Sequence, residues 1–362
     1  MNTINVKLES EQEYNVTIGT DLLPKCGEII TAVHAPCRVA LVTDFTVGAI
    51  YTNTVADSLR KEGFEVFIFA FYAGETSKNM ENYGKLLEFL ADNEITRSDI
   101  IVALGGGVVG DLSGFAAATY MRGIPYVQIP TTTIAMVDSS VGGKTSIDLE
   151  AGKNLCGAFW QPISVICSVD TLSTLDKRYF DDGVAEIIKY GMLGNDKILR
   201  ILEDCIATQD NTYHALKPFL EDIVEESINT KISFVEADVH DNGRRQFLNF
   251  GHTIGHAVEH ASRYAFSHGQ AVAIGMCSIA RAGEALGFTE EGTAAHLEQL
   301  VQGVGLPTNT IIPVQDLYNS ALSDKKRRGH EISLIVPSKI GKCEITKVSI
   351  DELKNILDLG VK

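Results

Sequence analysis

The sequence lacks three features that would assign it to other classes of protein. It contains no uninterrupted apolar run of about 18 residues, and its first residues have no apolar core of the signal-peptide kind, so no membrane segment is expected. No Cys-x-x-Cys pair occurs and the seven cysteines are an odd number, which favours reduced thiols in a cytoplasmic protein over disulfides. Basic residues are a minority: the net charge of −16 argues against broad binding to nucleic acids or membrane surfaces.

The chain is otherwise of ordinary globular composition, and its 362 residues suffice for two domains. Short β-rich runs alternate with helical patterns in the first half, which predicts a Rossmann-like α/β domain with a parallel sheet. The expected strands, after a hairpin in residues 1–20, are 38–43, 65–71, 99–104, 126–129 and 164–168. Helix-periodic stretches follow at 184–207, 214–235, 250–263, 269–286 and 293–304, with a strand at 332–337 and a helix at 350–359. The sequence therefore predicts an α/β domain over 1–176 and a mostly α-helical domain over 177–362.

Histidines gather in one stretch of the second half. His252, His256 and His260 follow one another at a spacing of four, and His268 comes soon after. On a helix this spacing predicts one shared face, and imidazole is the commonest metal ligand. The residue after His252 is Thr253 rather than the glutamate of the zinc-protease motif. The stretch indicates either a metal site of another kind or a helix with half-buried polar spacers.

A metal site of this kind still needs a carboxylate or a further nitrogen ligand. Glu186 and Lys189 are three residues apart in a helical stretch and therefore share a face. They form either an ordinary helix ion pair or a site in which Glu186 supplies the missing ligand. The residue pattern alone leaves both possibilities open.

A glycine-rich turn follows the third expected strand. Gly105-Gly106-Gly107-Val108-Val109-Gly110 fits G-x-G-x-x-G after a strand and before a helix, where backbone amides can approach a pyrophosphate. The motif is not in the first strand–helix unit, so a tight packing turn is the alternative. Asp44, Glu75 and Lys78 follow earlier strands and are further candidates for nucleotide contact.

A second glycine turn carries a lysine. Gly142-Gly143-Lys144-Thr145 resembles the end of a P-loop, but Asp138 stands where that motif requires glycine. A Gly-Gly-Lys turn can still hold a phosphate. Arg122 and Lys153 lie on either side of it in the sequence, so the segment predicts either anion binding or solvated surface charges.

Taken together, these motifs resemble those of the 3-dehydroquinate synthase family. Pro130-Thr131-Thr132, Gly152-Lys153-Asn154 and Asp324-Lys325-Lys326 belong to the same pattern, and the resemblance runs in order from about residue 44 to 340. It implies an enzyme that converts 3-deoxy-D-arabino-heptulosonate 7-phosphate into 3-dehydroquinate and phosphate in the shikimate pathway. It also implies bound NAD, one divalent metal ion (zinc or cobalt), a homodimer and a cytoplasmic location.

The resemblance also implies roles for individual residues. Glu186, His252 and His268 would be the metal ligands. The NAD site would comprise Asp44, Gly74, Glu75, Lys78, Gly107, Val108, Val109, Gly110, Asp111, Thr131, Thr132, Lys144, Lys153, Thr171, Leu172, Ser173 and Thr174. Substrate binding and catalysis would involve Asp138, Lys144, Lys153, Asn154, Lys189, Lys231, Arg245, Asn249, His256, Lys325 and Lys326, with Arg122 supplied by the partner subunit. The chain departs from the family pattern at Thr46 and at Val239.

Two related activities compete with this interpretation. Another sugar-phosphate cyclase, such as 2-deoxy-scyllo-inosose synthase, would have no use for Arg245 and Lys231 as carboxylate-binding residues, since its substrate has no carboxylate. A metal-dependent alcohol dehydrogenase would need fewer phosphate-binding cations. A non-catalytic metal- and nucleotide-binding module is the third alternative, and the full set of metal, NAD and anion residues argues against it.

Overall fold

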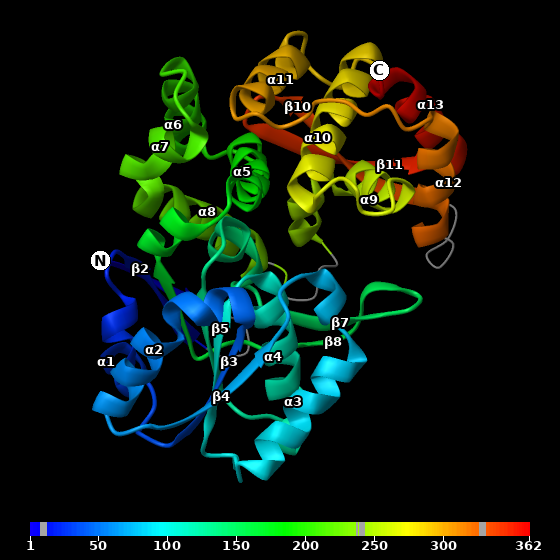
Figure 1. The fold of residues 1–362 in the computed structure, drawn as a ribbon. Helices are drawn as coiled ribbons and strands as arrows, with labels where there is room; N and C mark the ends of the chain where they lie inside the picture. The colour runs from blue at the N-terminus through cyan, green and yellow to red at the C-terminus, as the bar shows by residue number, and fades with distance from the viewer. Residues whose placement is uncertain (8–12, 237, 239–242, 326–330) are drawn as a thin grey trace. The chain divides into compact units, whose positions relative to one another are not determined.

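The computed structural model describes residues 1–7, 13–236, 238, 243–325 and 331–362. These residues form two compact units, Met1–Leu175 and Asp176–Lys362 (Figure 1). Among them, no helix combines the length and the apolar character that crossing a membrane requires.

The first unit is built on one parallel sheet with an antiparallel strand at its edge. The sheet has the order β1-β2-β9-β6-β5-β3-β4, in which only β1 and β2 pair antiparallel. The strands are β1 (Asn2–Lys7), β2 (Glu13–Gly19), β3 (Arg38–Asp44), β4 (Glu65–Phe71), β5 (Ile100–Gly105), β6 (Tyr126–Pro130) and β9 (Ser164–Ser168). The predicted Rossmann-like fold and hairpin are therefore confirmed.

Helices cover both faces of this sheet, which explains why its central strands are apolar throughout. Alternate residues of one strand enter different cores: Leu41 packs with α1 and α2, whereas Val42 packs with α3 and α4. The helices are α1 (Cys26–Thr31), α2 (Phe45–Lys61), α3 (Met80–Asp92) and α4 (Gly107–Thr119). Because each strand is fixed from both sides, the loops at its carboxyl end have a rigid base.

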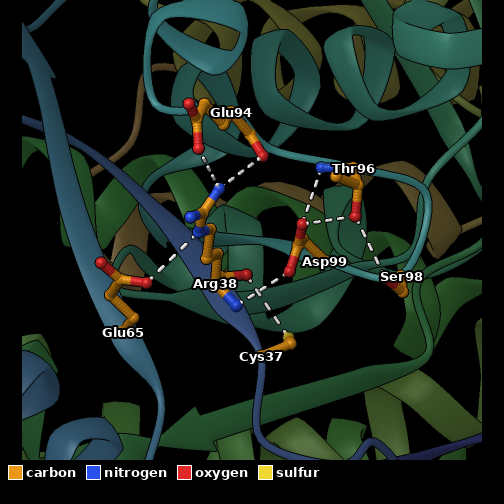
Figure 2. A network of polar contacts seen from close by, with 7 residues as sticks. All are labelled: Cys37, Arg38, Glu65, Glu94, Thr96, Ser98 and Asp99. Carbon is orange, nitrogen blue, oxygen red and sulfur yellow. Dashed lines mark hydrogen bonds and ion pairs between the residues drawn. The ribbon is translucent and has the colours of Figure 1, made fainter.

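The amino edge of the sheet is occupied by a polar network around Arg38 (Figure 2). The guanidinium lies 3.2 Å from Glu65 and 3.0 Å from Glu94. Asp99 accepts hydrogen bonds from the backbone amides of Arg38 at 2.9 Å and Thr96 at 2.7 Å. Asp99 therefore closes the turn before β5, and the strand begins one residue later than predicted.

A hairpin that the sequence analysis did not predict follows the second glycine turn. It consists of β7 (Lys144–Leu149) and β8 (Gly152–Phe159), paired antiparallel. Gly142 and Gly143 both have positive φ, 98° and 68°, which glycine adopts without steric cost. The Gly-Gly-Lys segment therefore leads into a strand, whereas a P-loop would lead into a helix.

The second unit is mostly helical, as predicted. Its helices are α5 (Lys177–Met192), α6 (Asp196–Ala207), α7 (Thr212–Leu216), α8 (Leu220–Val235), α9 (His252–Ala261), α10 (His268–Ala285), α11 (Thr293–Gly303), α12 (Val314–Lys325) and α13 (Ile350–Gly360), with the hairpin β10 (Glu331–Lys339) and β11 (Lys342–Ser349). The predicted stretch 184–207 is two helices, because Gly194 has φ 118° and the side chain of Asn195 caps α6. Pro218 likewise divides the predicted stretch 214–235. Helix α12 and strand β11 were not predicted.

Helices α9 and α10 pack at close range because glycines face each other across their contact. A Cβ atom at Gly275 of α10 would collide with the carbonyl oxygen of Gly251, just before α9. A Cβ at Gly255 of α9 would lie 3.1 Å from the backbone of Ala271. The absence of side chains at these positions lets two histidine-bearing helices approach each other.

Gly275→Ala is expected to lower the stability of the chain by about 1–3 kcal/mol, because the added methyl must push the two helices apart. Denaturant unfolding measures this loss. Gly84→Ala in α3 is the control, since nothing lies within 4 Å of its Cβ position and alanine is the better helix residue by about 0.5–1 kcal/mol. Equal midpoints for the Gly275 variant and the parent chain would contradict the proposed role of close helix packing.

Candidate active site

Most of the residues predicted to bind NAD follow the carboxyl ends of neighbouring strands in the first unit. Gly107 begins α4 directly after β5, and Asp44 ends β3. Three further members lie elsewhere: Lys78 is later in the loop after β4, and Lys144 and Lys153 are in the segments Lys144–Leu149 and Gly152–Phe159. The others follow strands directly: Gly74 and Glu75 after β4, Val108, Val109, Gly110 and Asp111 in α4, Thr131 and Thr132 after β6, and Thr171, Leu172, Ser173 and Thr174 in the 3₁₀ turn Val169–Thr174 after β9. Because carboxyl ends of parallel strands share one edge, the structure brings this set to the edge where such sheets bind ligands.

Two glycines at this edge, Gly106 and Gly107, lie where there is little room for a side chain. A Cβ at Gly106 would lie 2.9 Å from the Thr132 side chain, and one at Gly107 would lie 3.1 Å from the Ser139 hydroxyl. The glycines thus let two ligand loops approach each other. Asp44 has a structural role as well: its carboxylate accepts hydrogen bonds from the amides of Thr46 at 2.8 Å and Val47 at 3.0 Å, which caps α2.

Lys78 is the centre of a buried polar cluster in the first unit. Its ammonium lies 3.1 Å from a carboxylate oxygen of Glu75 and 3.1 Å from one of Asp111, and it donates to Oδ1 of Asn154 at 2.6 Å. Burial lowers the pKa of Lys78, but the surrounding carboxylates outweigh this and raise the pKa above its ordinary value. Lys78 thereby joins the loop after β4, helix α4 and the β7–β8 hairpin.

Two members of this cluster were not predicted from the sequence. Asp148 lies 3.9 Å from the Lys78 ammonium, and burial raises the pKa of its carboxyl. Ser146 donates a hydrogen bond to Oδ1 of Asn154 at 2.8 Å. Since Oδ1 of Asn154 accepts from both Lys78 and Ser146, its amide NH₂ is oriented away from them. No pattern in the sequence indicated this role, because the segment Lys144–Leu149 mixes polar and apolar residues.

The other predicted anion-binding residues of the first unit lie on separate elements. Lys144 begins β7 and Lys153 is in β8. Asp138 is in a π-helical turn, Ala135–Ser139, and such turns are frequent at functional sites. Arg122 is exposed and ends a 3₁₀ turn before β6, which puts it at the amino edge of the sheet. It is therefore not brought together with the carboxyl-edge residues of its own unit.

Three predicted metal ligands converge in the second unit. Nε2 of His252 lies 3.5 Å from Oε1 of Glu186, and Nε2 of His268 lies 3.3 Å from the same oxygen. The Glu186 side chain is fully buried. The ligand atoms of the three residues all lie within 4.8 Å of one another. Two imidazoles and one carboxylate at such distances fit a single zinc or cobalt ion and leave coordination positions for a substrate.

The second nitrogen of each imidazole already has an acceptor. Nδ1 of His252 lies 3.1 Å from the carbonyl oxygen of Phe250, and Nδ1 of His268 lies 3.3 Å from a carboxylate oxygen of Glu259. A carbonyl oxygen only accepts, so Nδ1 of His252 carries the proton and its Nε2 keeps a lone pair. Glu259 favours the same tautomer in His268. Both Nε2 atoms are thereby presented toward Glu186, as metal ligands require.

The two ligand histidines differ in basicity. Burial lowers the pKa of His252 to about 3, and the neighbouring Lys189 acts in the same direction. Burial also lowers the pKa of His268, but its hydrogen bonds to Glu186 and Glu259 more than offset this and raise the pKa to about 10. The proton of His268 and a divalent cation therefore compete for the same space beside Glu186.

The prediction that three histidines of α9 share one face is wrong for His260. Residues eight apart on a helix differ in direction by roughly 80°, and Nδ1 of His260 lies 3.0 Å from the Ser320 hydroxyl on α12. His252 and His256 do lie together, with ring centroids 5.6 Å apart. His256, Glu259 and His268 form a second group of potential ligands, but Glu259 already accepts from His268 and the His256 residue is exposed.

Buried cations accompany the metal ligands in the second unit. Lys189 forms an ion pair with Glu186 and is 1% exposed, Arg245 is 2% exposed and Lys231 is 6% exposed. Burying a charge is unfavourable unless partners surround it, and Lys189 has such a partner in Glu186. Asn249 ends the 3₁₀ turn Arg244–Asn249 that carries Arg245. Lys325 is the last residue of α12, whereas Lys326 and Val239 lie outside the described residues.

Solved structures with the same fold are sugar-phosphate cyclases and alcohol dehydrogenases. A 2-deoxy-scyllo-inosose synthase, solved with carbaglucose-6-phosphate, NAD⁺ and Co²⁺, superposes with a TM-score of 0.89 at 24% identity, covering 99% of this chain and 100% of that one. The 2-epi-5-epi-valiolone synthase of Streptomyces hygroscopicus subsp. jinggangensis 5008, solved with NAD⁺ and Zn²⁺, gives 0.87 at 25% identity with 96% of each chain covered. An iron containing alcohol dehydrogenase gives 0.66 at 16% identity, covering 96% and 98%. The fold is thus the one that sugar-phosphate cyclases share with more distant alcohol dehydrogenases.

Sequence comparison identifies the family among proteins of this fold. The models for the 3-dehydroquinate synthase N-terminal and C-terminal parts match residues 68–182 and 183–327. The 3-dehydroquinate synthase of Streptococcus mutans serotype c is 42% identical over 357 residues, 98% of this chain and 99% of the relative. That of Clostridium acetobutylicum is 42% identical over 354 residues, 97% and 98% of the two chains. The chain belongs to the 3-dehydroquinate synthase family, which confirms the resemblance seen in its motifs.

Proposed function

We propose that this chain converts 3-deoxy-D-arabino-heptulosonate 7-phosphate into 3-dehydroquinate and inorganic phosphate, as a step of the shikimate pathway. The observation that carries the proposal is the convergence of Glu186, His252 and His268 in a chain of this family. The reaction is redox-neutral overall, although a hydroxyl of the sugar is oxidised and later reduced in the same turnover. Transient oxidation acidifies the neighbouring C–H bond, so phosphate leaves by β-elimination before ring opening and aldol closure.

The first unit would hold NAD at the carboxyl edge of its sheet. When bound, NAD supplies an acceptor for the hydride and returns it later in the turnover. The glycine-rich start of α4 would let the backbone amides approach the pyrophosphate, and the missing side chains at 106 and 107 leave room for Thr132 and Ser139 beside it. Lys78 would keep Asp111 and Glu75 in place around the cofactor.

The second unit would hold the metal through Glu186, His252 and His268. A bound divalent ion supplies a Lewis acid that lowers the pKa of the substrate hydroxyl. Lys189 keeps the Glu186 carboxylate oriented through their ion pair and adds positive charge where an alkoxide or enolate forms. His256, whose ring centroid lies 5.6 Å from that of His252, is suited to proton transfer or to a phosphate contact.

Buried cations in the second unit support a substrate that carries a carboxylate. Arg245 and Lys231 are both nearly inaccessible, and their two positive charges would suit the carboxylate that distinguishes this substrate from other sugar phosphates. Asn249, at the end of the same turn as Arg245, would add a contact to a hydroxyl. In the first unit, Lys144, Lys153 and Asn154 would bind the phosphate and neighbouring hydroxyls, with Asp138 nearby in sequence.

The decisive experiment measures phosphate release from the heptulosonate phosphate while the absorbance of NADH is followed. We expect many turnovers per NAD, no accumulation of NADH, and loss of phosphate release after treatment with a chelator. Stoichiometric formation of NADH would instead identify a dehydrogenase. Turnover of glucose 6-phosphate in place of the heptulosonate phosphate would identify another cyclase.

The active form would be a homodimer in which Arg122 completes the site of the partner subunit. Arg122 is exposed and precedes β6, so it is at the sheet edge opposite to the nucleotide residues of its own unit. Across a two-fold interface, Arg122 would instead reach the site of the partner subunit, and two-fold dimers are the commonest assembly. The cytoplasm is the proposed location, supported by the cysteines, all seven of which are free thiols.

Mixing of inactive subunits tests the role of Arg122. Arg122→Ala and His252→Ala are each expected to be nearly inactive as homodimers. If Arg122 acts across the interface, a mixed dimer has one site with both lesions and one intact site, so activity returns toward half of normal per mixed dimer. Differently tagged subunits identify the mixed dimers. Mixed dimers that remain inactive would mean that Arg122 acts within its own subunit.

A further inference from the structure

Helix α9 contributes one metal ligand and, on nearly the same face, a carboxylate that contacts another ligand. His252 and Glu259 are seven residues apart on this helix, which brings them to nearly the same face. The Glu259 side chain is only 7% exposed, and its carboxylate lies 3.3 Å from Nδ1 of His268. A single helix face thus carries one ligand, His252, and a carboxylate that contacts the ring of another ligand.

The backbone of His268 is fixed separately by helix α5. Ser267 is the N-cap of α10, and its hydroxyl donates a hydrogen bond to Asp182 of α5. A side chain at Gly269 would collide with the backbone of Asp182, so the start of α10 packs directly against the backbone of α5. These contacts fix the backbone of His268, but they determine neither the rotation of its ring nor which ring nitrogen carries the proton.

We propose that Glu259 is a positioning residue of the metal site. Its carboxylate accepts the Nδ1 proton of His268, which fixes both the ring rotation and the tautomer. Nε2, 3.3 Å from Glu186, thereby keeps its lone pair available to bind the ion. A carboxylate behind a ligand imidazole also makes that imidazole a stronger ligand. This inference rests on the proposed function, because it concerns the same ion.

A different arrangement would make Glu259 itself a ligand. Glu259, His256 and His268 could together hold an ion, with His268 binding through Nδ1. Two observations favour the positioning role. Nε2 atoms of both His252 and His268 lie within 3.5 Å of the fully buried Glu186, whereas His256 is exposed. The two arrangements predict opposite effects of removing His256.

The experiment measures the affinity of the full-length apo chain for Zn²⁺ by competition with a chromophoric chelator. Glu259→Ala is expected to bind Zn²⁺ about 10- to 100-fold more weakly than the parent chain. Glu259→Gln retains an acceptor for the Nδ1 proton and is expected to lose less. Glu284→Ala is the matched control: Glu284 is a carboxylate of the same unit that accepts from the backbone of Ala294 and touches no metal ligand. It is expected to bind Zn²⁺ like the parent chain.

Two further readouts separate positioning from a loss of structure. In the Zn²⁺-loaded chain, the ¹⁵N chemical shifts of His268 report which nitrogen carries the proton and which binds the ion, and we expect only the Nδ1-protonated form in the parent chain and a mixture in Glu259→Ala. The visible spectrum of the Co²⁺-loaded chain should change in Glu259→Ala, while its unfolding midpoint without metal stays close to that of Glu284→Ala.

Three results would each overturn the positioning role of Glu259. A folded Glu259→Ala chain with parental Zn²⁺ affinity would overturn the positioning role and leave the proposed function untouched, provided that His252→Ala loses the ion. Loss of Zn²⁺ in His256→Ala as severe as in His252→Ala would overturn it in favour of Glu259 as a ligand. A parent chain that binds no Zn²⁺ or Co²⁺ would refute the proposed metal site itself, and this inference with it.

Discussion

Replacing His252 with alanine is expected to remove the bound metal and to lower kcat/KM by about three orders of magnitude or more. His252 provides one of three ligand side chains, and its Nε2 lies 3.5 Å from Glu186. Two remaining ligands cannot hold the ion at working concentrations, and the substrate hydroxyl then keeps its ordinary pKa. Metal analysis after gel filtration, together with the phosphate-release assay, measures both losses.

His260→Ala is the matched control for this experiment. His260 lies on the same helix, but its Nδ1 is 3.0 Å from the Ser320 hydroxyl, and it belongs to neither group of potential metal ligands among the described residues. It should therefore keep its metal and its turnover. A full metal complement in His252→Ala, or an empty site in His260→Ala, would show that the ligands have been assigned incorrectly.

Lys78→Met is expected to weaken NAD binding by about 10- to 100-fold, because a buried charge-assisted hydrogen bond contributes about 1.5–3 kcal/mol. It should also destabilise the first unit by about 3–5 kcal/mol, since it leaves the carboxylates of Glu75 and Asp111 without the cation between them. Calorimetric titration with NAD and denaturant unfolding measure the two effects.

Two further variants serve as controls for the effects of Lys78→Met. Lys85→Met removes an exposed lysine that pairs with Glu81 on the surface of α3, and such pairs contribute at most about 1 kcal/mol. The double variant Lys78→Met/Asp111→Asn removes one of the uncompensated carboxylates and should regain part of the stability, though not the affinity for NAD. If Lys78→Met were no less stable than Lys85→Met, the buried cluster would not support the cofactor loops.

The strands of the parallel sheet and the loops after them were predictable because they depend on local sequence, whereas β7, β8 and β11 were missed. The strands β3, β4 and β9 are five to seven residues long and are dominated by apolar and β-branched side chains, and both faces of such strands must be covered. The breaks within the second unit were harder to predict. Gly194 and Pro218 interrupt apolar patterns that continue at nearly the same period on either side, so the hydrophobic pattern alone gives one long helix where the backbone forms two.

The sequence by itself determined the family, the glycine turns after the strands and the candidate metal ligands, because motif order and residue type are properties of the linear chain. The tertiary structure decided which of the histidines act together. His260 follows His252 at a helical spacing, but over eight residues the turn of the helix directs its side chain toward Ser320 on α12. His268, which lies on another helix, comes beside Glu186 because Gly269 lets α10 contact α5. The roles of Glu259 behind His268 and of Asp148 beside Lys78 likewise arise only from packing, because the spacing of residues in the sequence reveals neither their burial nor their distance in space.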